Sequence, residues 1–84
     1  MNDEPLMAAV VQLVLFLELS PPETLDEDAA VRALEDLAAT LHTLGDAEKA
    51  RFVAYVEQVA GNAETPPERE CLRRMPEVLG LVPD

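Results

Sequence analysis

The segment LMAAVVQLVLFLEL, residues Leu6–Leu19, carries the strongest structural signal in the chain, because twelve of its fourteen residues are apolar. Its valines are compatible with a strand, but the run is long for one and the chain offers no convincing partner strand. A lone strand would leave its backbone donors and acceptors unpaired. The run therefore predicts a helix that Asp3 opens, with Pro5 in its first turn, and that Ser20-Pro21 ends.

A helix that is apolar on all sides must also be covered on all sides. The sequence leaves two ways to cover it: the other helices of the chain surround it, or it supplies part of an interface between copies.

The next helix is predicted over residues 24–45, from Thr24 to Gly45. Its apolar residues step by 4, 3, 4 and 3, which places them on one stripe of a helix: Ala30, Leu34, Leu37, Leu41 and Leu44. Two capping boxes lie near its start, Ser20–Glu23 before it and Thr24–Glu27 at its first residues. We interpret the first as the stop and turn after the apolar run and predict Thr24 as the N-cap. Gly45 is predicted as the C′ residue.

Two shorter helices follow. Asp46 is expected to cap one that ends near Gly61-Asn62. The run Thr65-Pro66-Pro67-Glu68 has every feature of a capping box with proline at the first helical position. It predicts a last helix from Pro66 to about Met75, stopped by Pro76. The apolar tail EVLGLV, residues 77–82, is expected to dock on the core.

These patterns predict an all-α protein, a compact bundle of four helices of unequal length with antiparallel neighbours and short connections. Residues 1–84 are expected to form a single helical domain. With only two Phe and one Tyr, the core must be built from Leu, Val and Ala.

Charge is unevenly distributed along the chain, whose formal net charge is −11. Residues 1–48 hold eleven acidic residues against one base, Arg32, which gives a net charge of −10. Nucleic acid is an unfavourable ligand, because phosphate binding relies on Lys and Arg. The acidic start MNDEP does not resemble a secretory signal, and the run Leu6–Leu19 is shorter than the about 20 residues that span a bilayer. With a single cysteine, a cytoplasmic protein with no membrane partner is expected.

No enzyme motif is present. Ser20, His42 and Cys71 are the only residues of their types, and their predicted positions do not suit a catalytic triad. The acidic run Asp26–Asp28 lacks the spacing and glycine of a calcium loop, and the chain has no Glu-x-x-His pair for a di-iron site. We therefore expect no cofactor, no metal site and no catalytic activity. Cys71 is expected in the core, and His42 in the last turn of its helix, where its partial charge suits the dipole.

The leading functional hypothesis is a small acidic module that docks a basic partner protein, as an inhibitor, immunity protein or adaptor does. The candidate partner-binding residues are Glu23, Asp26, Glu27, Asp28, Glu35 and Asp36. The alternative is a self-associating structural subunit, a homodimer formed through the first helix, in which the charge serves solubility.

Overall fold

The computed structural model describes residues 3–82 and contains four helices, which confirms the all-α prediction. Helix α1 is Glu4–Leu19, α2 is Glu27–Leu41, α3 is Asp46–Gly61 and α4 is Pro66–Val78. The radius of gyration is 12.6 Å, close to the about 12 Å expected of a folded chain of this length.

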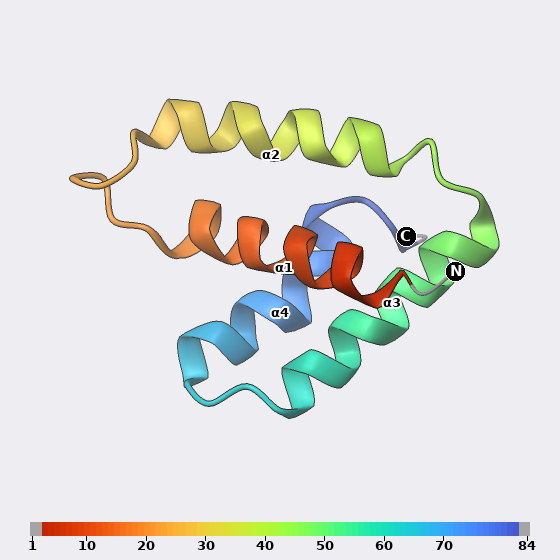
Figure 1. Cartoon of the computed structure of the whole chain (residues 1–84). Coiled ribbons are helices and arrows are strands. Elements are labelled where there is room, and N and C mark those ends of the chain that lie inside the picture. The colour runs from red at the N-terminus through yellow and green to blue at the C-terminus, as the bar shows by residue number, and fades with distance from the viewer. Residues whose placement is uncertain (1–2, 83–84) are drawn as a thin grey trace.

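The helices form two antiparallel hairpins, α1–α2 and α3–α4, as Figure 1 shows. The hairpins meet through α1, which packs on α4 and more lightly on α3, while α2 packs chiefly on α1. The shared core of residues 3–82 is mainly aliphatic, and Phe52 is its one buried aromatic ring. Its most deeply buried side chains are Val14, Val56, Leu72, Met75 and Leu79.

The pattern of α1 is confirmed: Asp3 precedes the helix, proline lies in its first turn and Ser20 is the C-cap. The Asp3 carboxylate, however, forms no capping hydrogen bond. It instead accepts a hydrogen bond from Arg51 of α3 at 2.6 Å, in an ion pair between partly exposed side chains. Such a pair contributes at most about 1 kcal/mol to stability.

The predicted stripe of α2 is confirmed, but the predicted ends are wrong. Ala30 and Leu41 are buried, while Leu34, Leu37 and Leu44 are half-buried against the core. The N-cap is Asp26, whose carboxylate accepts a hydrogen bond from the N–H of Ala29 at 3.1 Å.

Thr24 does not cap α2, because a turn takes up its backbone. The N–H groups of Thr24 and Leu25 both donate to the carbonyl of Pro21, at 2.9 and 3.0 Å. Ser20–Glu23 therefore ends α1 and begins this turn, as predicted, and α2 begins only after Asp26.

The connection from α2 to α3 also differs from the prediction. Helix α2 ends at Leu41 with His42 as C-cap, and tight turns with N–H groups of Thr43 and Leu44 as donors follow. Gly45 is the N-cap of α3 and has φ of −68°, so it does not adopt the left-handed conformation of a C′ glycine. Asp46 is the first residue of α3, not its cap.

Pro76 does not stop α4, which continues to Val78. A proline this close to the end costs the helix one backbone hydrogen bond, and its buried ring contributes to the core. The helix is ended by Gly80, with φ of +69°. The N–H groups of Gly80 and Leu81 donate to the carbonyls of Glu77 and Pro76, which is a Schellman motif.

The other predicted boundaries hold. Helix α3 ends at Gly61 with Asn62 as C-cap, and Thr65 caps α4 by accepting a hydrogen bond from the N–H of Glu68. The tail docks as expected, because Leu79 and Leu81 are buried in the core.

Candidate functional site

Helix α1 carries two apolar stripes. Val11, Val14 and Leu17 are buried in the core. The second stripe is Leu6, Ala9, Leu13 and Phe16, which step by 3, 4 and 3 and lie on a different side of the helix. All four are exposed, and Leu6, Leu13 and Phe16 retain 66%, 48% and 50% of their surface. We call these four residues the α1 stripe.

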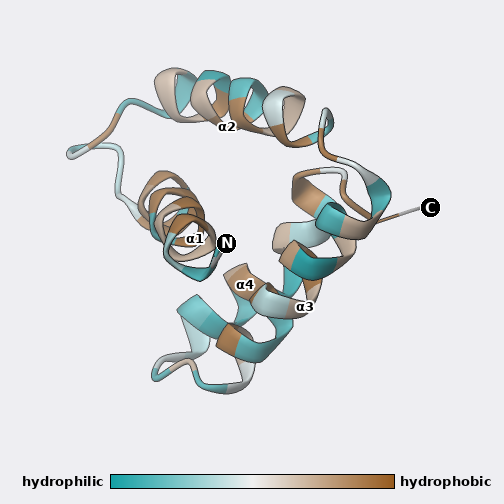
Figure 2. Cartoon of the chain, turned by 45° about the vertical axis from the view of Figure 1, so that its right-hand side comes forward, coloured by the Kyte–Doolittle hydropathy of each residue, from teal (hydrophilic) through white to brown (hydrophobic). Residues whose placement is uncertain are grey.

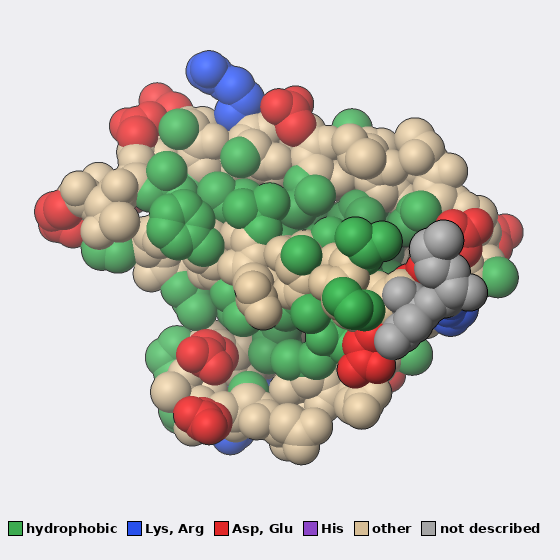
Figure 3. Space-filling model, viewed as in Figure 1, with side chains coloured by type: hydrophobic (Ala, Val, Ile, Leu, Met, Phe, Trp, Pro, Cys, Tyr) green, Lys and Arg blue, Asp and Glu red, His purple; other side chains and the backbone are tan. Residues whose placement is uncertain are grey.

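The other helices of the chain therefore leave one apolar side of α1 uncovered. Figure 2 shows α1 mostly in the brown of apolar residues, and helices lie on only part of its circumference. On the face drawn in Figure 3, apolar side chains form a band along α1 and the adjacent flank of α2, with acidic side chains at its edges.

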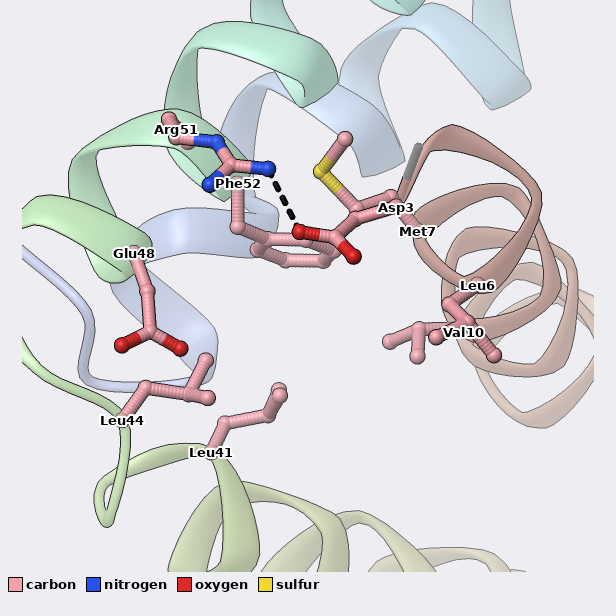
Figure 4. A pocket seen from close by; sticks show the side chains of 9 residues that line it. All are labelled: Asp3, Leu6, Met7, Val10, Leu41, Leu44, Glu48, Arg51 and Phe52. Carbon is pink, nitrogen blue, oxygen red and sulfur yellow. Dashed lines mark hydrogen bonds and ion pairs between the residues drawn. The ribbon is translucent and has the colours of Figure 1, made fainter. Parts of the chain in front are cut away.

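A small pocket lies at one end of the α1 stripe, where α1, the end of α2 and the start of α3 meet. Its volume is about 260 Å³. Leu6, Met7 and Val10 line it from α1, and Leu41, Leu44 and Phe52 line it from the other elements. Figure 4 shows the Asp3–Arg51 ion pair at one edge of the pocket and the carboxylate of Glu48 at another. Leu6 belongs to both the pocket and the stripe, so the two surfaces are continuous.

The six predicted partner-binding acids are all exposed, but they do not form one cluster with one role. Glu23 lies in the turn before α2, and Asp26 is the N-cap of that helix. Glu27 and Asp28 occupy the first turn, where negative charge is favourable to the helix dipole. These four have local structural reasons to be acidic or polar.

Glu35 and Asp36 have no such reason, because they lie in the middle of α2. Their carboxylates form no ion pair with any of residues 3–82. Adjacent residues of a helix point about 100° apart, so the two lie on different flanks of α2. Among the predicted site residues, these two are the acids that the fold does not explain.

The residues considered for catalysis are not brought together. Ser20 follows α1 and His42 follows α2, at opposite ends of the hairpin, about 22 Å apart along α2. Cys71 is buried, and burial raises the pKa of its thiol above the ordinary value, with a further contribution from Glu18 that Arg74 partly offsets. A protonated, buried thiol is a core residue.

In residues 3–82 no three His, Cys, Asp or Glu side chains are grouped so that they could hold a metal ion. None of the helices in the described part of the chain combines the length and apolar character needed to cross a membrane.

No protein-family model, no curated protein and no solved structure matches this chain.

The sequence predicted the acids as partner-binding residues and offered the first helix as a dimer interface, but it did not identify the residues of the α1 stripe. The signal was present in the apolar residues that recur on every side of Leu6–Leu19. Which side stays exposed depends on where the other three helices pack, and the sequence pattern does not contain that information.

Proposed function

We propose that this protein is a small acidic module without catalytic activity that binds a basic partner protein through its α1–α2 hairpin. The observation that carries the proposal is the exposed α1 stripe on the half of the chain that holds almost all of the net negative charge. Exposed apolar side chains at helical spacing favour contact with another protein, and the surrounding carboxylates favour a cationic one.

Uneven charge supports the same proposal. Residues 49–84 hold six acids and five bases, a net charge of −1, so solubility alone gives no reason to concentrate the charge in the other half. A concentrated field increases the association rate of an oppositely charged protein and loses its effect as salt rises.

The test is the association rate of the native partner, recovered from the host at low salt and identified by mass spectrometry. Glu35→Gln/Asp36→Asn should slow association several-fold at low salt, with the difference shrinking as salt is added. The matched control is Glu57→Gln/Glu64→Gln, which removes the same charge from exposed positions of the other hairpin. Equal rates for both double variants would show that the acids of α2 only solubilise the protein.

A second candidate function is self-association through α1, favoured by the same exposed stripe. A homodimer would bury Leu13 and Phe16 of both copies. Light scattering across a dilution series from high to low micromolar concentration tests it, with Leu13→Ser/Phe16→Ser as the variant expected to remain monomeric. The monomer mass at every concentration would exclude this candidate.

A further inference from the structure

Given the proposed function, on which this inference rests, we infer that the basic partner presents a cationic amphipathic helix, which docks along the α1 stripe and places one apolar side chain in the adjoining pocket.

The spacing of the stripe favours a helix. Steps of 3, 4 and 3 from Leu6 to Phe16 are the spacing with which one helix packs on another. The stripe extends roughly 15 Å, about three helical turns, which matches a short docking segment and not a broad, flat protein surface. Helix-in-groove recognition relies on such anchors at i, i+3, i+4 and i+7.

The pocket is small and mostly apolar. Its volume of about 260 Å³ is below the range of roughly 300–1,000 Å³ typical of sites for drug-sized ligands. Six apolar side chains line it, and one of them, Leu6, starts the stripe. An apolar anchor in a pocket beside a flatter contact surface is the usual arrangement of an interaction hot spot.

Charge decides between a foreign helix and a second copy. Two α1–α2 hairpins brought together would each contribute residues of the segment with a net charge of −10. Like charges placed close together across an interface are unfavourable, whereas Lys and Arg beside the apolar face of a partner helix would contact the carboxylates at the edges of the band. The occupant that fits both the apolar stripe and its acidic border is a cationic amphipathic helix.

The experiment uses three synthetic peptides of about 15 residues, roughly four helical turns. The first is built from Leu and Lys, with Leu on one helical face. The second has the same composition, with Leu distributed around the helix. The third is the first with Glu in place of Lys. Calorimetry at low salt measures affinity, and circular dichroism measures whether the peptide becomes helical on binding.

The decisive protein variant is Ala9→Arg, at an exposed position in the middle of the stripe. The arginine is bulky, carries the same positive charge as the Lys peptide and leaves no cavity in the fold. Its matched control is Ala39→Arg, the same change at an exposed position of α2. The two variants alter the charge of the hairpin equally, so a difference between them reports on the stripe and not on the overall field.

We expect the amphipathic Lys peptide to bind in the micromolar range and to become helical. The permuted peptide and the Ala9→Arg protein should each bind about tenfold more weakly, and Ala39→Arg should lose much less. Thermal unfolding of both variants verifies that they are folded.

Equal binding of the two Lys peptides, or equal loss for both Arg variants, would overturn the helix inference while leaving a purely electrostatic basic partner. If no peptide binds while a native basic partner still binds through α2, the helix inference is likewise overturned and the proposed function stands. Binding of the Glu peptide as tight as that of the Lys peptide would remove the inference and the proposed function together. If the protein forms a stable dimer that buries the stripe and does not bind the Lys peptide, the occupant of the stripe is a second copy of the chain and not a partner helix.

Discussion

Thr65 illustrates what a single residue reveals from sequence. The hydroxyl residue, two prolines and glutamate at 65–68 predict a helix start from local chemistry alone, and Thr65 does accept the hydrogen bond from Glu68. Thr24 has a similar local signature but does not cap a helix. Its N–H donates to the carbonyl of Pro21 in a turn, and Asp26, two residues further on, caps α2 instead. Capping motifs can be found by pattern, but the choice between adjacent candidates depends on the path of the chain.

Thr65→Ala should therefore lower the free energy of unfolding by about 1 kcal/mol, and Thr65→Ser should hardly change it, since serine retains the accepting hydroxyl. Urea denaturation measures both. Thr24→Ala is the control and should be near neutral, because Thr24 lies exposed in the turn before α2. A loss at Thr24 as large as that at Thr65 would contradict the assignment of Asp26 as the cap of α2.

Gly80 supports a second prediction at the same scale. Its φ of +69° is unfavourable for a residue with a Cβ, and a Cβ there would lie 2.7 Å from Nε2 of His42. The His42 side chain is exposed and can move, so the backbone conformation dominates the cost. Gly80→Ala should destabilise the fold by about 1–2 kcal/mol, measured by urea denaturation.

Gly61→Ala is the matched control, because Gly61 is the last residue of α3 and a Cβ there would meet nothing within 4 Å. This change should be neutral or stabilising by up to about 1 kcal/mol, since alanine is the better helix former. If both alanine variants behaved alike, the left-handed conformation of Gly80 would not be what ends α4.

At the scale of elements, the number and order of helices were predictable, because each has its own apolar spacing and punctuation. The buried face of α1 could not be predicted, because an almost uniformly apolar helix gives no periodic signal for its inner face. The ion pair between Asp3 and Arg51 was equally hidden, since it joins residues 48 positions apart and local patterns do not extend that far.

Adjacent residues of α1 should consequently differ in their contribution to stability. Val14 is 1% exposed and Leu13 is 48% exposed. Val14→Ala should cost about 2 kcal/mol through lost contacts and a cavity, while Leu13→Ala should cost less than about 1 kcal/mol. Chemical denaturation compares the two directly. Similar losses would mean that the stripe is covered in solution, which favours self-association.

At the scale of the whole molecule, the net charge of −11 opposes compactness, because like charges repel in the folded chain. Sodium chloride should raise the free energy of unfolding by up to about 1 kcal/mol, because it screens the repulsion between the acidic side chains of the α1–α2 hairpin. Urea midpoints at low and high salt measure the effect. It should shrink in Glu35→Gln/Asp36→Asn, and a salt response unchanged in this variant would mean that repulsion arises elsewhere.

The attachment of α2 has a consequence for motion. Because α2 packs chiefly on α1, and two of its three inner leucines, Leu34 and Leu37, are only half-buried, it can detach while α1, α3 and α4 keep their mutual contacts. Native-state hydrogen exchange should then show two classes of amide protons, with those of α2 exchanging through a partial opening that costs less free energy than global unfolding. In that open form α1 would expose a second face, the one on which α2 normally lies.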